Sequence, residues 1–467
     1  MNSIICTKRL LILFFKFMTI IGLAVFIVFS GVSCNIFKVK ETKTQSTEET
    51  EATTAKESQK DNGQSTVIEI NIWDSTTPKE RIALMDSIEK FMVLNKEIKI
   101  ESRHFRSEEE LIDQFEASSL AGSGPEILLS SFDSAQRLAS SSAIRNVDSM
   151  IDFNEIIDGL VEISNYSSKK YIIPFRATDF LMLFYNKSLV ESVPSDLTSL
   201  IEYCKKVSKS NKPKEKEPTY GFLLNSKEPD WIIPFIGSYQ DWIVDYNTNS
   251  ITLNTQSTQK TLEFLVKIYN EEKILPYGME YEEINNSFKN GKAHMIINGI
   301  WAIDEYKQEG INFGVSKIPI LSDGYNDPTP LINGTGFMIN VNCYDKELEA
   351  SQGLIKYLLS ADVQAGWTFN TQTMPVLKNM SENHDIQNDP IFLNAFEQEK
   401  ICRGMPGEKT IRVIRDAIRV NLENVIKGNI TPQDATVKIQ EDAIKLISDS
   451  ITIEKLNNEE STSTSKT

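Results

Sequence analysis

Apolar and polar residues alternate along residues 67–73 (VIEINIW), a pattern typical of a β-strand with one buried face. Thr77, Pro78 and Glu80 follow in an order that can start a helix, because threonine can cap, proline suits the first helical position and glutamate can close a capping box. An apolar stripe at helical spacing comes next, and residues 97–101 return as a strand. Strand, helix and strand at this spacing predict a βαβ unit and therefore a parallel sheet.

The same alternation of strand and helix patterns continues along the chain. A helix is expected over about 107–121, and a short buried strand follows Gly124 and Pro125. Further strands are expected at 171–175, 181–185, 294–297, 313–315 and 337–341, and further helices at 257–271, 347–360, 411–427 and from Thr431 to about 455. This order predicts an α/β fold with more than one sheet.

The N-terminus has a different pattern, because its first 33 residues hold no acidic residue. Basic residues come first, an uncharged apolar run follows, and small residues lead up to Cys34, which is the order of a secretory signal. The cysteine looks like that of a bacterial lipobox, although Gly31 stands where that motif usually has leucine. We therefore expect a signal peptide over 1–33 and lipidation of Cys34. The alternative is an uncleaved anchor, because the uncharged run continues to Phe37. Both interpretations place the folded part outside the cytoplasm.

Residues 34–66 are dominated by Thr, Glu, Lys, Ser and Gln. Such a segment buries too little apolar surface to offset the entropy of ordering, so it predicts a disordered tether between membrane and domain. The tail over 457–467 is expected to be disordered as well. The folded body is then about 67–456, which is long enough for two sizeable cores.

Charge and composition exclude several classes of protein. The 467 residues include 49 basic and 65 acidic ones, a net charge of −16, and cleavage before Cys34 removes three basic residues and leaves −19. A chain this acidic lacks the basic surface of a nucleic-acid binder. Three scattered histidines and five cysteines without CxxC spacing argue against a zinc cluster, so we expect no metal or cofactor. For Cys204, Cys343 and Cys402, both one disulfide and free buried thiols remain open.

Seven stretches of the body form an ordered set: INIWDSTTPKERIALMDSIEKF, LAGSGPEILLSSFD, YIIPFRATDFLMLFYNKSLV, FKNGKAHMIINGIWAIDEY, INFGVSKIPI, GTGFMINVN and MPGEKTIRVIRDAIRVNLENVIKGNITPQDATVKIQ. Together, behind Cys34, they resemble the family-1 extracellular solute-binding proteins of bacterial ABC importers, the maltodextrin-binding type among them. The resemblance implies a two-lobed periplasmic-binding-protein fold in which each lobe is a mainly parallel sheet flanked by helices. Lobe one would be 67–177 plus 337–385, and lobe two 182–332 plus 390–456, with the ligand in the cleft and closure by a hinge motion.

A sugar site needs aromatic platforms and planar polar partners. Trp301 follows a strand and a turn that contains Gly299, and the resemblance implies that this tryptophan of the INGxW stretch stacks on sugar. Trp231 lies in a segment that lines the pocket of the resembled proteins, and Trp367 precedes a loop. For each tryptophan the alternative is packing in a core.

Polar candidates come from loops at strand ends. A carboxylate just beyond a strand, such as Asp133, points into the crevice of an open α/β sheet. Arg415 stands where maltodextrin-type members use an aromatic, which indicates a smaller or more polar ligand, an acidic one included. The remaining candidates are Asp74 and Ser75 in the WDSTT loop, Arg106, Asp179 at the expected hinge, and Thr335 in GTG, each with a structural role as its alternative.

The function that these features predict is a lipid-tethered, monomeric sugar-binding receptor that delivers its ligand, a mono- or oligosaccharide, to the permease of an ABC transporter. The same fold could bind a polyamine, a metal ion or an organic anion, or serve as a sensor lipoprotein. An extracellular glycan-degrading enzyme would need paired carboxylates, but nothing singles out a pair, and HExxH and GxSxG motifs are absent. We therefore expect no enzymatic activity.

Overall fold

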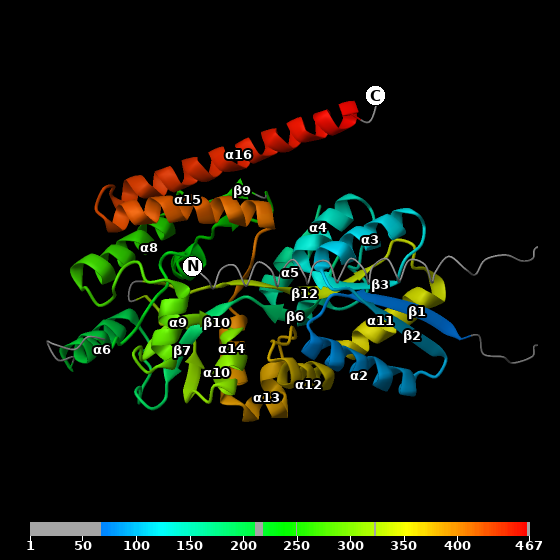
Figure 1. Cartoon of the computed structure of the whole chain (residues 1–467), viewed down its shortest axis with the longest axis horizontal. Helices are drawn as coiled ribbons and strands as arrows, with labels where there is room; N and C mark the ends of the chain where they lie inside the picture. The colour runs from blue at the N-terminus through cyan, green and yellow to red at the C-terminus, as the bar shows by residue number, and fades with distance from the viewer. Residues whose placement is uncertain (1–66, 211–217, 249, 322–323, 465–467) are drawn as a thin grey trace, which may run out of the picture. The chain divides into compact units, whose positions relative to one another are not determined.

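Two sheets hold the longer strands in this computed structural model, which describes residues 67–210, 218–248, 250–321 and 324–464, with side chains described to residue 450 (Figure 1). The expected signal peptide, Cys34 and the tether lie outside the described residues. The chain divides into two units, Met1–Gln64 and Ser65–Thr467, and the second contains both sheets.

The predicted βαβ unit is confirmed. Strand β1 (Ile68–Asp74) pairs in parallel with β2 (Ile98–His104), and helix α2 (Pro78–Leu94) connects them. The capping box also forms as expected, because the Thr77 side chain accepts from the Glu80 amide while the Glu80 carboxylate accepts from the Thr77 amide at 2.9 Å. The capping residues therefore start helix α2 at the position that the sequence predicts.

The larger sheet has the strand order β13-β12-β3-β1-β2, with β6 also paired to β12. Its other strands are β3 (Ile127–Ser131), β6 (Ile173–Thr178), β12 (Leu331–Ile339) and β13 (Arg403–Gly404). Strand β3 runs parallel to β1, whereas β12 runs antiparallel to both β3 and β6. Strand β12 begins six residues earlier than its apolar pattern predicts, because its first half pairs with β6 and β13.

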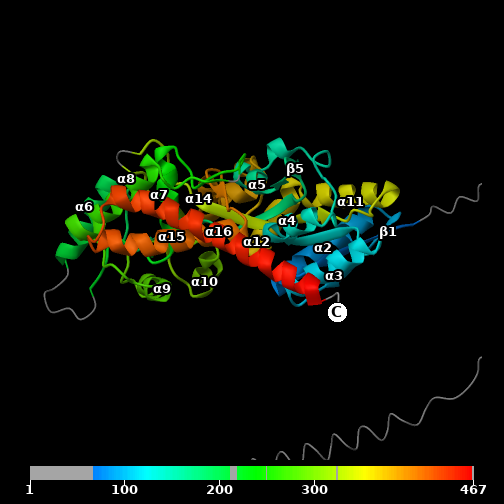
Figure 2. The same cartoon turned by 90° about the horizontal axis from the view of Figure 1, so that it is seen from above.

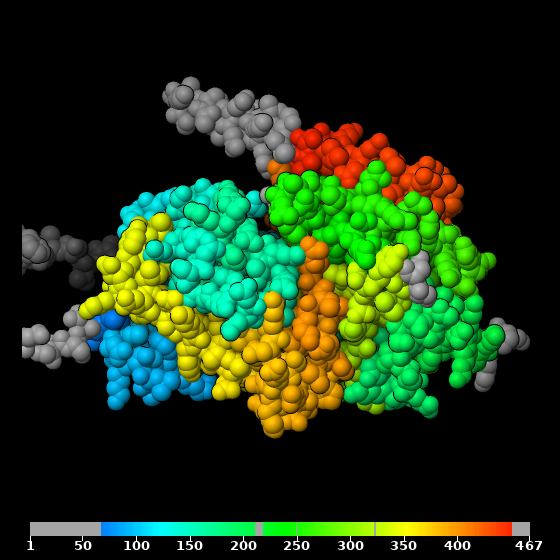
Figure 3. All heavy atoms as spheres, turned by 180° about the vertical axis from the view of Figure 1, so that it is seen from behind, coloured from blue at the N-terminus to red at the C-terminus, as the bar shows by residue number. Residues whose placement is uncertain are grey.

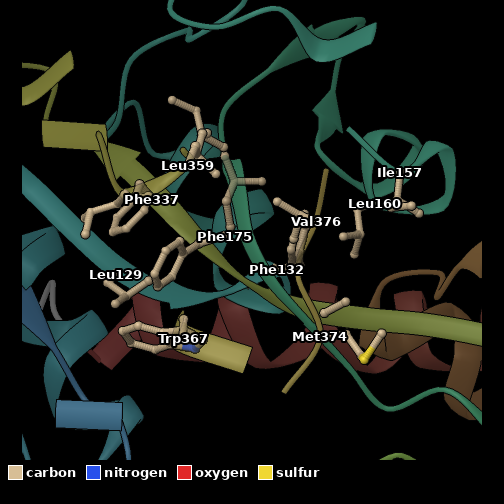
Figure 4. Close-up of a cluster of buried hydrophobic side chains, with 14 of the residues drawn as sticks. Leu129, Phe132, Ile157, Leu160, Phe175, Phe337, Leu359, Trp367, Met374 and Val376 are labelled. Atoms are coloured by element: carbon tan, nitrogen blue, oxygen red, sulfur yellow. The ribbon is translucent and has the colours of Figure 1, made fainter. Parts of the chain in front are cut away.

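Helices cover both sides of this sheet (Figure 1). Helices α3 (Glu108–Leu120) and α4 (Phe132–Ser140) lie on one side, and α2 lies on the other with α11 (Asp345–Leu358) and α12 (Ala361–Thr371). Figure 4 shows the core beneath the sheet, where the Phe175 ring lies 4.7 Å from that of Phe337 and 4.6 Å from that of Trp367, centroid to centroid.

The smaller sheet has β7 (Leu181–Asn186) between β10 (Met295–Gly299) and β11 (Phe313–Ser316). Both pairings are antiparallel, although a parallel bridge joins Leu223 to Ile296. The expected mainly parallel pairing therefore describes β1, β2 and β3 and not these strands. The chain enters β7 directly from β6, which sets the direction of β7 against that of its neighbours.

Strand β7 is buried on both faces, which explains its uninterrupted apolar run. Leu181 and Leu183 pack into one core, which also holds the inner faces of α8 (Gln256–Val266) and α15 (Glu408–Ile426). Met182 and Phe184 face the other core, which continues under the larger sheet. Because this second core is shared, both sheets belong to one compact unit.

Within the described residues the chain passes between the two sheets twice, at 179–180 and at 317–330, and β13 then pairs with β12 in the larger sheet before α15 begins. In Figure 3 the orange segment, which includes α14 (Pro390–Glu399), separates the cyan and green parts of the surface.

The last helix, α16 (Pro432–Thr464), packs beside α15 and α8 and continues past residue 456, where the tail was expected to begin (Figure 2). The remaining elements are α5 (Asp158–Ile163), α6 (Leu197–Ser210), α7 (Ile233–Ile236), α9 (Tyr281–Lys289), α10 (Ala302–Gln308), α13 (His384–Asn388), β4 (Asn165–Tyr166), β5 (Lys169–Lys170), β8 (Val244–Asp245) and β9 (Ser250–Ile251).

Cys204, Cys343 and Cys402 are free, buried thiols. Cys204 lies in the core with α8 and α15, and the other two lie in the shared core. Burial raises the pKa of Cys204 to about 12 and that of Cys343 to about 11. A buried thiol that keeps its proton is a poor nucleophile.

Glu399, the last residue of α14, is completely buried, and neither carboxyl oxygen has a hydrogen-bond partner among the described residues. Burial raises the pKa of Glu399 well above its ordinary value of 4.5. The unfolded chain then loses this proton near pH 4.5 while the folded chain keeps it, so the group lowers stability as the pH rises from there towards the folded pKa.

We expect Glu399→Gln to raise the thermal unfolding midpoint at pH 8, and to raise it less at pH 5. The amide is nearly isosteric and carries no charge. It therefore removes the loss of folding stability, about 1.4 kcal/mol per pH unit, that the Glu399 carboxyl causes between pH 4.5 and its folded pKa. Differential scanning fluorimetry across this pH range measures the difference. The matched control is Glu397→Gln in the same helix, where the side chain is 45% exposed and paired with Lys400. A gain for Glu399→Gln that does not grow with pH contradicts the argument.

Candidate functional site

A pocket of about 260 Å³ lies where the chain passes between the two sheets. It is lined by Asp179, Leu181, Asp230, Trp231, Trp301, Leu331, Met405 and Arg415. Asp179 lies between β6 and β7, and Leu331 begins β12, so the pocket is next to both passages. Four of the sequence candidates, from four separate segments, therefore meet in one pocket.

Two tryptophans form the aromatic wall of the pocket. Trp301 follows β10 and is 44% exposed, while its Nε1 donates to the Tyr281 hydroxyl at 3.0 Å. Trp231 is 8% exposed and donates from Nε1 to the Ile297 carbonyl at 2.8 Å. Their ring centroids are 6.3 Å apart at 74°, an edge-to-face arrangement. Trp231 thus supports Trp301, whose ring is available to an apolar face of a ligand.

Arg415 and Asp230 form the charged end of the pocket. Arg415 projects from α15, and its Nε and Nη2 donate to the two carboxylate oxygens of Asp230 at 2.8 and 2.6 Å. This bidentate fork fixes both side chains, because the guanidinium and carboxylate planes match. The Arg415 Nη2 also contacts the Met405 sulfur at 3.7 Å.

Asp179 adds a carboxylate in the connection between β6 and β7. Its backbone is left-handed, with φ of 58°, a conformation that aspartate tolerates better than most residues. The Thr178 hydroxyl donates to Asp179 Oδ2 at 2.9 Å, which orients the carboxylate.

Asp133 and Thr335 lie at the edge of the larger sheet. Asp133 is in the first turn of α4 and accepts from Asn333 Nδ2 at 3.4 Å. Partial burial raises the pKa of Asp133, and the nearby carboxylates of Glu408, Glu108 and Asp179 add to the effect. Asn333 also lies 3.9 Å from the sulfur of Met405, a pocket-lining residue, so this edge adjoins the pocket.

The Thr335 hydroxyl oxygen is buried and has no partner among the described residues. Thr335 pairs with Ser131 of β3 and with Arg176 of β6, so the three side chains share one face of the sheet. Arg176 is held by Glu80 at 3.0 Å, but its buried Nε has no hydrogen-bond partner within the described part of the chain.

Comparison with known proteins decides the family. A model of the bacterial extracellular solute-binding proteins matches residues 86–394, which is well over half of the chain. This chain belongs to that family. The suspected resemblance is therefore confirmed.

Relatives of this solute-binding protein span most of its length. A galactooligosaccharide-binding protein of Bacillus subtilis (strain 168) is 24% identical over 336 residues, covering 69% of this chain and 77% of the relative. A maltooligosaccharide ABC transporter solute-binding lipoprotein of Streptococcus pneumoniae (strain R6) is 23% identical over 350 residues, covering 73% and 79%. The solved maltose/maltodextrin-binding domain of Bdellovibrio bacteriovorus, bound to maltotriose, superposes with a TM-score of 0.59 and 28% identity, covering 82% of this chain and all of that one. The two-lobed α/β fold of the family is thus the fold of this chain.

The other predicted site residues of this solute-binding protein do not line the pocket. Asp74 is completely buried at the end of β1, where it pairs with Arg81 and His104 and accepts from the Thr76 hydroxyl at 2.7 Å. Trp367 is 3% exposed and belongs to the core in Figure 4. Arg106 is exposed after β2, and Ser75 is half-buried beside Asp74. Their roles as ligand contacts stay predictions.

One ion pair places the loop of Ser75 close to the aromatic wall. Lys79, at the start of α2, lies 3.0 Å from Asp304 of α10, three residues after Trp301. The loop between β1 and α2 therefore reaches the second sheet beside the pocket.

Sequence reasoning missed Asp230, Met405, Tyr281 and Arg176. Asp230 could have been found, because it adjoins Trp231 in an otherwise apolar turn. Arg176 could have been found as the charged residue inside the otherwise apolar strand IPFRAT of β6. Nothing in the sequence marks Tyr281 as the partner of Trp301, since they are 20 residues apart.

The described residues hold neither a metal-ion cluster nor a membrane-spanning helix. No three histidine, cysteine or carboxylate side chains there are grouped to hold a metal ion. Likewise, none of the helices in the described part of the chain has the length and apolar character needed to cross a membrane.

We expect Gly299→Ala to displace the Trp301 ring. A Cβ at Gly299 would lie 2.1–2.2 Å from ring carbons of Trp301, closer than any real contact, so the ring must move. Overpacking of this kind costs about 1–3 kcal/mol. The near-ultraviolet circular dichroism of the variant should lose the band that Trp301→Ala also loses. Gly366→Ala in α12, where a Cβ meets nothing within 4 Å, should leave the spectrum unchanged and not destabilise the fold. An unchanged spectrum for Gly299→Ala would show that the ring is not held there.

Proposed function

We propose that this protein is an extracytoplasmic, lipid-anchored receptor that captures a carbohydrate between two lobes and delivers it to the permease of an ABC transporter. The observation that carries the proposal is the half-exposed Trp301 ring in a pocket that also holds Asp179, Asp230 and Arg415. Sugars combine an apolar ring face with hydroxyl groups at the rim, and this mixture of aromatic and planar polar side chains suits both. Two relatives support the ligand class, since one is named a galactooligosaccharide-binding protein and the other a maltooligosaccharide ABC transporter solute-binding lipoprotein.

We assign the two sheets to two lobes. Lobe one is 67–177 plus 337–385, and lobe two is 182–332 plus 390–456. The two passages of the described chain between the sheets support this division, because a hinge needs few connecting segments, while β13 and the first residues of β12 extend the larger sheet into lobe two. In this proposal the pocket belongs to lobe two and the hinge, Thr335 lies in the crossing between the lobes, and Asp133 approaches the ligand from lobe one when the lobes close.

The anchor of the receptor is Cys34. The order of basic, apolar and small residues before it supports cleavage of 1–33, and the pneumococcal relative is itself named a lipoprotein. Residues 34–66 then serve as the tether, and the receptor acts as a monomer. Mass spectrometry of the membrane-bound form decides this part, since an unmodified Met1 would exclude lipidation of Cys34.

The ligand class is tested by a thermal-shift screen of residues 35–467 against mono- and oligosaccharides. A ligand that binds only the folded state raises the unfolding midpoint, by about 2.7 kcal/mol of added stability at a hundred times Kd. Polyamines and organic anions belong in the same screen. A shift with one of these and with no sugar would overturn the carbohydrate proposal.

A further inference from the structure

The charged end of the pocket differs in kind from its aromatic wall. Arg415 and Asp230 come from residues 185 positions apart, and both line the pocket that Trp301 borders. Their side chains are only 29% and 27% exposed. A half-buried, bidentate pair of this kind does not swing aside easily, so it is a fixed boundary of the pocket.

The unused hydrogen-bond donors of Arg415 are also fixed. The fork occupies Nε and Nη2, and Nη1 has no polar partner among the described residues. Nη1 carries two N–H groups, which can reach acceptor oxygens of a ligand. The charge of Arg415 is already balanced by Asp230, so these donors suit neutral hydroxyl or ring oxygens. A carboxylate placed here would meet the carboxylate of Asp230 as well.

The size of the pocket sets a second limit. Its volume of about 260 Å³ is just below the range of about 300–1,000 Å³ in which drug-sized ligands are held. One sugar ring against Trp301, or two rings in a compact arrangement, uses this space. On the side of Arg415 and Asp230, a longer saccharide would have to displace this ion pair.

We infer that the Arg415–Asp230 pair terminates the binding site and selects short, neutral saccharides, of one or two rings, whose hydroxyl oxygens face Arg415 Nη1. This inference rests on the proposed carbohydrate function and narrows it. It separates this chain from the solved Bdellovibrio domain, which is bound to a trisaccharide. It also differs from the sequence-based expectation that Arg415 could signal an acidic ligand, because Asp230 balances the charge of the guanidinium.

Isothermal titration with two series, glucose to maltotetraose and galactose to β-1,4-galactotetraose, tests the length limit. In the series that binds, affinity should reach its maximum at the mono- or disaccharide, and the trisaccharide should differ from the disaccharide by less than threefold. A gain of tenfold or more from two to three rings overturns the inference and leaves the proposed function intact. Failure of every sugar in the thermal-shift screen overturns both.

The charge selection is tested by Asp230→Asn, which is nearly isosteric, keeps one acceptor oxygen for Arg415 and leaves the charge of Arg415 unbalanced. We expect affinity for glucuronic or galacturonic acid to rise at least tenfold relative to the corresponding neutral sugar. The matched control is Glu228→Gln, which breaks the exposed pair with Arg419 in the same segment and should leave the ratio unchanged. If Asp230→Asn does not fold, Arg415→Met replaces it, and its neutral-sugar affinity should fall about tenfold. An unchanged ratio in a folded Asp230→Asn, or unchanged affinity in Arg415→Met, overturns the selection by charge.

Discussion

Replacing Trp301 by alanine is expected to weaken sugar binding about 30-fold or more while the protein stays folded. Truncation of a central aromatic contact costs about 2 kcal/mol or more, and each 1.4 kcal/mol is a factor of ten in Kd. Stability should change little, because the ring is 44% exposed before any ligand binds. Isothermal titration with the sugar identified by the screen gives the loss, and Trp301→Phe should retain part of the affinity, because a smaller aromatic face remains.

The matched control for this experiment is Tyr325→Ala. Tyr325 is 67% exposed and does not line the pocket, so its removal takes away a comparable exposed aromatic ring without touching the site. Both variants should unfold close to the wild-type temperature. Equal affinity of Trp301→Ala and wild type would remove Trp301 from the ligand site.

The second large effect is expected from Asp74→Ala, which should lower the free energy of unfolding by about 3 kcal/mol. The carboxylate is completely buried, and its loss removes the counter-charge of Arg81, which keeps only its contacts to Ser102, and the acceptor of the Thr76 hydroxyl. Breaking a buried pair by removing one member costs about 3–5 kcal/mol, and the lower end applies because the Arg81 side chain is 22% exposed. Urea unfolding at pH 7 measures the change.

Asp86→Ala on the neighbouring helix surface is the control for Asp74→Ala. Asp86 also pairs with a cation, Lys90, but both side chains are more than half exposed, so water replaces the lost contact. A midpoint for Asp74→Ala as high as that of Asp86→Ala would show that the buried network contributes little.

Signals between residues close in sequence predicted local structure well. The capping box of Thr77 and Glu80 forms, and the strand expected at 313–315 is found at Phe313–Ser316. In these cases the physical cause lies within one turn or one strand, so neighbouring residues contain the information. The family was also within reach of the sequence, because seven ordered stretches carry it.

Long-range pairing was harder to predict. The first half of β12 contains Asn333, Gly334 and Thr335 and shows no apolar alternation. It forms a strand because β6 lies against it, so closely that a Cβ on Gly334 would be 2.2 Å from the Arg176 carbonyl oxygen. The sequence of β12 alone does not show the approach of another strand, and so the prediction began at residue 337.

Residue type predicted the site only in part. Trp301 and Trp367 are both tryptophans near loops, yet one is half exposed and the other is packed against Phe175. Exposure depends on what covers the side chain, and that covering comes from distant segments. The pairing of Arg415 with Asp230 has the same cause, and our inference of a neutral ligand rests on it.

The three buried thiols give the folded chain internal reporters of opening. Cys204 lies in the core that holds α8 and α15, whereas Cys343 and Cys402 lie in the core under the larger sheet. Each is protonated and covered in the native state, so a disulfide reagent can modify it only when that part of the protein opens. With two serine replacements leaving one thiol at a time, the labelling rate at each cysteine would rank the local opening free energies of the two cores without any added probe.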